Sequence, residues 1–286
     1  MKKLSLVFLP ALLALGLCAG CGQAEKTAGV PDTTAASVFA QEKTEEDVHT
    51  DAAPKMREAK GELFYCGYGS LSTQEEQALY RQILRSLQNR EEETELPTLD
   101  QELVEPVFMT VLADHPEIFY ADGYSCTSYQ LGEEIRKLTF TGSYTMDEPE
   151  IVRRTGLLEE AADRWLAGLP DGGDYEKARY LYETLILHTE YQQGAQDSQN
   201  ICSVFLNGRS VCQGYAKALQ LLYQEAQIAS MLVTGEVNGQ GHAWIVAQLD
   251  GEWYHVDPTW GDASWQQDGQ DFATAQERPS VNYDYF

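Results

Sequence analysis

Three short segments in the last third of the chain constrain its fold most strongly. They are Gly208-Arg-Ser-Val-Cys212, Gly241-His242-Ala-Trp and Tyr254-His-Val-Asp257. A cysteine, a histidine and an aspartate can serve as nucleophile, base and orienting carboxylate when a fold brings them together. The chain must therefore place the start of a helix beside two strands if these residues work as one group.

The first segment predicts a helix that begins near Cys212. Ser210 and Gln213 fit the two ends of a capping box. Cys212 then lies in the first turn, where free N–H groups and the helix dipole stabilise a thiolate and can hold an oxyanion. Gly214 leaves space near the thiol for a substrate. As an alternative, Cys212 is a small buried hydrophobic residue or half of a disulfide. The expected apolar face contains Ala216, Leu219, Leu222, Tyr223 and Ala226.

The other two segments predict a tight hairpin. Asp250-Gly251 separates two runs typical of strands, 242–249 and 252–257. This dipeptide is a strong signal for a two-residue loop, which pairs the residues on either side of it and so fixes the register. A further strand is predicted over 231–237. The result is a three-stranded antiparallel sheet.

That register predicts a hydrogen bond between His242 and Asp257. Trp244 faces Asp257 and His242 faces Thr259, so the four residues share one face of the sheet. His242 and Asp257 are diagonal neighbours, roughly 7–8 Å apart at the backbone, which their side chains can bridge. We expect His255 to point to the opposite face from Asp257, and we assign it no role.

Each of these residues also has a structural interpretation. His242 could be an edge-strand histidine at a turn, and Asp257 could simply end a strand before Pro258. Trp244 and Trp260 are expected to pack around the site and keep it partly dry, which is compatible with a role as core aromatics.

The motifs together resemble those of the transglutaminase-like superfamily. The similar residues are Gly-x-x-x-Cys212-x-Gly-Tyr, Gly-His242-Ala-Trp and Trp253-Tyr-x-Val-Asp257-Pro-Thr-Trp-Gly-Asp262, and the likeness runs from about residue 174 to 262. The resemblance implies an α+β, papain-like fold in which the cysteine helix packs on an antiparallel sheet. It also implies a catalytic triad of Cys212, His242 and Asp257. Members include cross-linking enzymes, cysteine peptidases, peptide N-glycanases and inactive proteins. The family often adds a polar or aromatic side chain to the oxyanion hole, for which Tyr191, Gln192 and Gln199 are candidates.

The first twenty residues are typical of an export signal. Lys2 and Lys3 precede an apolar run over 4–17 that is short for a membrane span. Cys18-Ala-Gly-Cys21 resembles a bacterial lipobox, so we expect residues 1–20 to be removed and Cys21 to carry lipid. An ordinary secreted protein is the alternative. Residues 21–60 contain one aromatic and predict a flexible tether.

The formal net charge is -25, and removal of residues 1–20, which carry +2, leaves -27. Such a chain repels nucleic acid and anionic headgroups, so we expect no nucleic-acid partner and membrane contact through the lipid alone.

Residues 61–146 predict a small α+β domain without a catalytic motif. A capping box at Ser72 and Glu75 opens a helix that reaches about Asn89. A second helix is expected around 106–113, and a hairpin over 118–145 turns at 131–134. The buried stripe of the first helix should be Leu79, Ile83 and Leu87. The tyrosines expected to be half-buried on the strands are Tyr120, Tyr124, Tyr129 and Tyr144.

Residues 147–286 form the expected transglutaminase-like domain. Two helices, over 147–169 and from an Asp174 cap to about His188, lead to the Cys212 segment. The last residues, 282–286, read like the start of a strand, which predicts a domain truncated at its C-terminus.

Cleavage at Cys21 would leave Cys66, Cys126, Cys202 and Cys212. A nucleophilic Cys212 must be free, which permits a Cys66–Cys126 disulfide, whereas a Cys202–Cys212 disulfide would indicate a stapled binding domain. After residue 21 there is no Cys-x-x-Cys and no His-Glu-x-x-His, so metal binding is disfavoured and no cofactor is expected. Three further histidines belong to no constellation, namely His49, His115 and His188.

The sequence therefore predicts an exported, lipid-anchored enzyme that acts on carboxamides of extracellular proteins or peptides. Its acyl-enzyme would be resolved by water or by an amine, and the sequence leaves both routes open. The alternative is an inactive binding or scaffold protein of the same fold.

Overall fold

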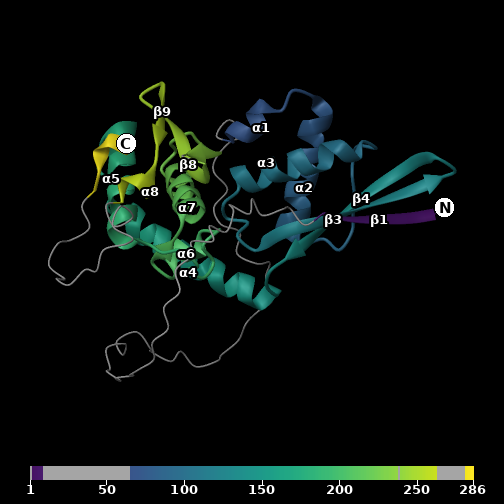
Figure 1. Cartoon of the computed structure of the whole chain (residues 1–286), viewed down its shortest axis with the longest axis horizontal. Helices are drawn as coiled ribbons and strands as arrows, with labels where there is room; N and C mark the ends of the chain where they lie inside the picture. The colour runs from purple at the N-terminus through teal and green to yellow at the C-terminus, as the bar shows by residue number, and fades with distance from the viewer. Residues whose placement is uncertain (1, 9–64, 238, 263–280) are drawn as a thin grey trace, which may run out of the picture.

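The computed structural model describes residues 2–8, 65–237, 239–262 and 281–286. These residues contain a four-stranded sheet, a three-stranded sheet and a short two-stranded pair, together with helices, so the predicted α+β class is confirmed. Figure 1 shows the first half of the chain in blue and teal on the right and the second half in green and yellow on the left.

The first sheet has the strand order β1-β3-β4-β2. Its core is the predicted hairpin, in which Leu131 pairs with Glu134 across a turn where Gly132 has φ 69°. A positive φ favours glycine, which explains the turn. The strands are β1 (Lys2–Phe8), β2 (Thr94–Glu95), β3 (Ala121–Leu131) and β4 (Glu134–Tyr144).

Strand β1 comes from the segment expected to be the export signal. It pairs antiparallel with β3, from Lys2 opposite Gln130 to Phe8 opposite Tyr124. Cleavage of the expected signal would remove β1 and leave β3 as the edge of this sheet. Cys21 and the predicted tether lie outside the described residues.

The helices of the first half are α1 (Cys66–Ser70), α2 (Gln74–Asn89), the 3₁₀ turn η2 (Gln101–Leu103) and α3 (Val104–Asp114). The capping box of α2 lies one residue beyond the predicted pair. Thr73 Oγ1 accepts from the Glu76 N–H at 3.1 Å, and the Glu76 carboxylate accepts from the Thr73 N–H at 2.8 Å. That carboxylate also accepts the Ser72 N–H, so Glu76 satisfies two backbone groups at once and this register is preferred over the predicted one.

The core of the first half forms between α2, α3 and the hairpin. Leu79, Ile83 and Leu87 are fully buried, as predicted, and Phe108 and Phe140 pack among them. Tyr120 and Tyr124 are more deeply buried than expected, whereas Tyr129 and Tyr144 are half-buried.

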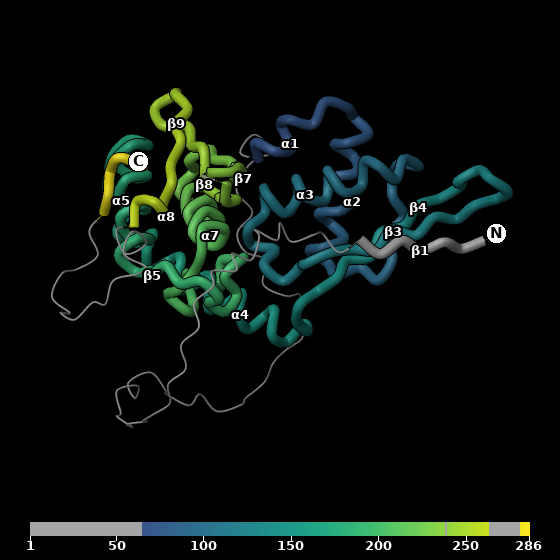
Figure 2. The backbone as a smooth tube through the Cα atoms, viewed as in Figure 1, coloured from purple at the N-terminus to yellow at the C-terminus, as the bar shows by residue number. Residues whose placement is uncertain are grey.

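The second half begins with α4 (Glu148–Leu166) and α5 (Asp174–His188) and ends on a sheet of order β7-β8-β9. Helix α7 packs against β7 and β8, and Figure 2 shows it beside these strands. The remaining elements are β5 (Glu190–Tyr191), α6 (Cys202–Phe205), β6 (Arg209–Ser210), α7 (Cys212–Glu225), β7 (Ser230–Val237), β8 (Gln240–Leu249), β9 (Glu252–Val256), α8 (Pro258–Gly261) and the 3₁₀ turn η4 (Tyr283–Tyr285).

Two boundaries differ from the predictions. Gly173, not Asp174, is the N-cap of α5, because Glu176 reaches back to accept the Gly173 N–H at 3.0 Å. The last residues form η4 and no strand, because Asn282 Oδ1 accepts the Asp284 N–H at 2.9 Å and closes a turn there.

The two halves meet through backbone and buried polar contacts. Tyr65 forms a β-bridge with Ser230 of β7, and Gln224 Nε2 donates to the Asp114 carbonyl at 2.9 Å. Helix α3 also packs against β7. Within the described ranges, no helix is long and apolar enough to cross a membrane.

Candidate active site

Cys212 is the first residue of α7 and is only 6% exposed. Its place in the first turn is as predicted, but the capping box is not formed. Val211 is the N-cap and makes no side-chain cap, while Ser210 lies in β6 and its hydroxyl pairs with that of Ser203 at 2.7 Å. Because the N-cap side chain does not bond them, the first-turn N–H groups of α7 are left for an oxyanion.

Gly214 has a different purpose from the predicted one. A Cβ at this position would lie 2.1 Å from Ser210 Oγ and 2.5 Å from Ser203 Oγ. The glycine lets α7 pack closely on this serine pair, so it sets the position of the helix rather than opening a path to the thiol.

His242 and Asp257 form the predicted hydrogen bond. His242 Nε2 lies 2.6 Å from Asp257 Oδ2, and the paired residues of β8 and β9 have the expected register, with Leu249 opposite Glu252. Cys212 lies close enough to His242 for its thiol to raise the pKa of the imidazole. Since Nε2 faces Asp257, the other ring nitrogen is left for the thiol. The fold thus brings the three residues together.

The carboxylate of Asp257 divides its two oxygens between two tasks. Oδ2 holds His242, while Oδ1 accepts the N–H groups of Thr259 and Trp260, each at 3.1 Å, and caps α8. Strand β9 ends at Val256, so Thr259 lies in a helix and does not pair with His242 as expected. The structural and functional interpretations of Asp257 are therefore compatible.

The environment of His242 favours its protonated form. Burial by itself lowers the pKa of His242, but hydrogen bonds and charge attraction from Asp257 and Cys212 outweigh it and raise the pKa to about 9. The ring therefore carries a proton at neutral pH, and this positive charge stabilises a thiolate beside it.

Two indoles flank the imidazole, as predicted. The ring of Trp244 lies 5.7 Å from that of His242, and the ring of Trp260 lies 5.5 Å away. Aromatic faces at this distance stabilise a cation.

The expectation for His255 was wrong. Residues two apart on a strand share a face, so His255 lies on the side of Asp257. Its Nδ1 accepts from Trp244 Nε1 at 2.8 Å, which fixes the indole beside His242. The period-two rule, applied correctly, would have found this contact.

The end of the chain supports the Asp257 turn. The Asp257 N–H donates to the Tyr285 carbonyl at 2.8 Å, and Tyr182 OH donates to the Asn282 carbonyl at 2.8 Å. A Cβ on Gly261 would lie 1.7 Å from Tyr182 OH, so this glycine allows α8 to pack against α5. These contacts hold Asp257 in place from three elements.

A buried pair joins α7 to the end of α8. Tyr215 OH donates to Asp262 Oδ2 at 2.7 Å, and both residues are fully buried. This bond fixes the cysteine helix relative to the aspartate turn.

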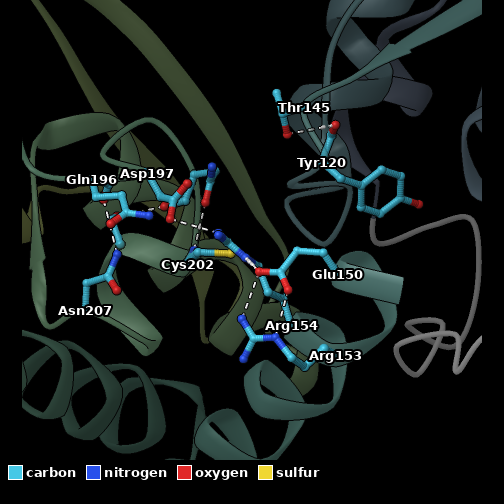
Figure 3. Close-up of polar contacts among 11 residues, drawn as sticks. Tyr120, Thr145, Glu150, Arg153, Arg154, Gln196, Asp197, Cys202 and Asn207 are labelled. Carbon is cyan, nitrogen blue, oxygen red and sulfur yellow. Dashed lines mark hydrogen bonds and ion pairs between the residues drawn. The ribbon is translucent and has the colours of Figure 1, made fainter. Parts of the chain in front are cut away.

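The segment before α6 is held by an ionic network, which Figure 3 shows. Arg154 of α4 donates to Glu150 at 2.6 Å and to Asp197 at 2.8 Å, and it also hydrogen-bonds to Cys202. Burial raises the pKa of Cys202 to about 12, with Arg154 opposing this and the nearby carboxylates adding to it. This thiol therefore stays protonated.

All four cysteines in the described part of the chain are free thiols. The possible pairs Cys66–Cys126 and Cys202–Cys212 are therefore not formed. Cys66 lies in α1 and Cys126 in β3, while Cys202 is held at the start of α6 by the Arg154 network. Cys212 is free, as a nucleophile must be.

A cavity of about 540 Å³ lies beside His242, between the two halves of the chain. The first half contributes apolar residues of α3 and the segment after it, including Leu112 and Phe119. Polar lining residues from the second half are Gln199, Asn200, Gln213, Lys217, Thr234 and His242.

The candidate oxyanion residues are placed differently from one another. Gln199 lines the cavity together with His242. The backbone N–H of Gln192 donates to the Ser210 carbonyl at 2.8 Å, and its side chain is exposed. The ring of Tyr191 lies 6.5 Å from that of Tyr215. Gln213, which also lines the cavity, was not predicted as an oxyanion residue.

Among the residues that the structure describes, no group of three or more His, Cys, Asp or Glu could hold a metal ion.

Comparison with known proteins agrees with this architecture. Residues 163–258 match the family model of the transglutaminase-like superfamily. The human kyphoscoliosis peptidase is 29% identical over 105 residues, which cover 31% of this chain and 16% of that protein. The chain thus spans about a sixth of this relative.

Solved structures share lower similarity. A TGase has 13% identity and a TM-score of 0.35, with 58% of this chain and 48% of that chain covered. The periplasmic domain of TgpA from Pseudomonas aeruginosa has 14% identity and a TM-score of 0.30, with 50% of this chain and 73% of that chain covered. The family match shows that the second half of this chain contains a transglutaminase-like domain.

Proposed function

We propose that this protein is a thiol acyl-transfer enzyme with Cys212 as nucleophile, His242 as acid and base, and Asp257 as the residue that orients His242. The observation that supports this most is the placing of His242. Its ring bonds Asp257 at 2.6 Å and lies close enough to Cys212, at the start of α7, for the thiol to raise its pKa.

The proposed reaction has two stages. The Cys212 thiolate forms a bond to the carbonyl carbon of a carboxamide or peptide bond, and the oxyanion lies at the first turn of α7. The C–N bond then breaks, and the departing amine takes the proton from His242. The remaining thioester is attacked by water or by an amine, which gives its proton to His242 and releases the thiol.

The proposed substrates are carboxamides of extracellular proteins or peptides, and the proposed location is the outer face of a bacterial membrane, with lipid on Cys21. The signal-like residues 1–20 and the lipobox-like segment support this location. The apolar walls of the 540 Å³ cavity support a peptide rather than a small ion as ligand.

The test is a product assay with the full chain. A peptide library rich in glutamine would be incubated with and without methylamine, and products read by mass spectrometry. Cleaved or deamidated peptides indicate hydrolysis, and methylamine adducts indicate transfer. Either product must disappear in Cys212→Ala and persist in Cys202→Ala.

A binding scaffold is the second candidate, and the low exposure of Cys212 favours it. Absence of every product, together with a Cys212 thiol no more reactive than a free cysteine, would support the scaffold and contradict the enzyme.

A further inference from the structure

The cavity beside His242 contains a lysine that forms no ion pair with the described part of the chain. Lys217 lies on α7 and lines the cavity. Among the described residues it has no ion pair, and Asp122, the carboxylate of the lining, is exposed and beyond ion-pair distance. The chain has 45 acidic residues, and yet none of the described ones lies within ion-pair distance of Lys217.

The position of Lys217 relative to Cys212 suits substrate binding. Gln213 and Lys217 are four residues apart, so they share the face of α7 that lines the cavity with His242. Cys212 and Lys217 are separated by about 7.5 Å along the helix axis and by about 140° around it. A substrate whose carbonyl lies at Cys212 must therefore extend past Gln213 and His242, which line the cavity, to reach the lysine.

The surroundings of Lys217 make its charge costly. Its neighbours in the lining include Leu232 and Ala243 of the sheet and Phe119 of the first half. Loss of hydration lowers the pKa of Lys217 to about 8, so at neutral pH most molecules still carry the charge. A partly desolvated ammonium without a partner destabilises a fold, and such features concentrate at functional sites.

We propose that Lys217 binds a carboxylate of the acyl donor, so that the enzyme prefers substrates with an acidic side chain or a free C-terminal carboxylate close to the attacked carbonyl. The ligand carboxylate completes a charge-assisted pair inside the cavity, and the apolar walls hold the neighbouring part of the substrate. This inference rests on the proposed function, since it places the substrate carbonyl at Cys212.

The test uses bromoacetyl compounds, in which the Cys212 sulfur bonds to the CH₂ carbon and bromide leaves. Bromoacetyl-β-alanine and its amide represent a C-terminal carboxylate and its neutral equivalent. Bromoacetyl-aspartic acid α-amide represents a side-chain carboxylate, and bromoacetyl-asparagine amide is its neutral equivalent. Labelling rates of Cys212 in the full chain would be measured at pH 7 by mass spectrometry, and the acid-to-amide ratio compared between variants.

We expect the ratio for at least one pair to fall about tenfold in Lys217→Met, as loss of a charge-assisted bond implies. Lys217→Arg should keep most of it. Lys177→Met is the matched control, because it removes the same charge from α5, away from the cavity. In the unmodified protein the ratio should also fall as the pH rises through about 8, which tests the lysine without any substitution.

The outcomes separate the two proposals. A reactive Cys212 whose ratios are the same in Lys217→Met as in the unmodified chain would overturn the role of Lys217 alone. A Cys212 that resists both members of every pair would contradict the proposed function and, with it, this inference.

Discussion

Cys202 and Cys212 lie at the first positions of two successive helices, and both are buried. Cys202 faces the Arg154 network with two carboxylates, and burial raises its pKa to about 12. Cys212 faces His242, which carries a proton at neutral pH. A helix start therefore does not distinguish these two thiols. The difference is the partner of each, and the proposed nucleophile is the thiol that has a histidine from the sheet beside it.

The largest expected effect separates the two cysteines. Cys212→Ser should reduce product formation by about 10³-fold or more, because an alcohol beside His242 is a far weaker nucleophile than a thiolate. Cys202→Ser should keep activity within a few-fold. The measurement is turnover in the peptide assay with and without methylamine. Equal losses in the two variants would contradict the distinction between them.

Substitution of Asp257 sharpens the comparison between the two cysteines, because it changes the support of His242 and leaves the Cys212 thiol in place. Asp257→Asn should lower activity about 10²- to 10⁴-fold, since the amide no longer holds a charged His242. Asparagine is a good N-cap, so α8 should remain and the melting temperature should change little.

Asp257→Ala is the matched variant. It should lose the same activity and also about 1 kcal/mol of unfolding free energy, because the two N–H groups of α8 lose their cap. Unfolding in urea beside turnover would distinguish the two losses. If Asn destabilised as much as Ala, the proposed division of the carboxylate would be wrong.

The network around Cys202 should matter for stability and not for chemistry. Arg154→Met breaks an ion pair with Glu150 within α4 and an ion pair with Asp197 that joins α4 to the segment before α6. We expect a loss of about 1–3 kcal/mol in unfolding free energy, since the arginine is largely buried and Asp197 is left without its partner. Alkylation of Cys212 in the folded protein should be within a few-fold of normal. A large fall in Cys212 labelling without unfolding would show that this network also supports the site.

The smallest expected effect is a gain in stability. Lys217→Met replaces a desolvated charge with an apolar side chain of similar length, and should raise the unfolding free energy by about 1–2 kcal/mol at pH 7. Folding lowers the pKa of Lys217 to about 8, so below that pH the charged lysine destabilises the folded state of the unmodified protein. The difference in unfolding free energy between Lys217→Met and the unmodified protein should therefore shrink as the pH rises from about 8 to 10.5. Urea unfolding at pH 7 and pH 10 measures this. A destabilised Lys217→Met would mean that the protein itself neutralises the lysine.

Much of the site could be predicted because it depends on local rules. The Asp250-Gly251 loop fixed the register of β8 and β9, and from that register followed the bond between His242 and Asp257. The position of Cys212 in the first turn of α7 was predicted correctly, although the Ser210–Gln213 capping box from which it was predicted does not form.

The errors have physical causes. The caps lie one residue from the predicted positions, at Thr73 and Gly173, because Glu76 and Glu176 accept the backbone N–H groups of these two residues. Ser210 was expected to cap α7, but a buried hydroxyl bonds to whatever lies nearest in space, and here that is Ser203. The Lys217 cavity could not be predicted, because it exists only where residues far apart in the sequence, from the two halves, meet.

The most direct test of the central claim is the pH dependence of iodoacetamide labelling at Cys212 and Cys202 in the same sample, read by mass spectrometry. His242→Ala is the comparison. We predict that Cys212 is labelled fast below pH 7, that this is lost in His242→Ala, and that Cys202 is labelled in neither protein while it is folded. Labelling of Cys212 that is slow at neutral pH and unchanged in His242→Ala would contradict the claim that His242 activates this thiol.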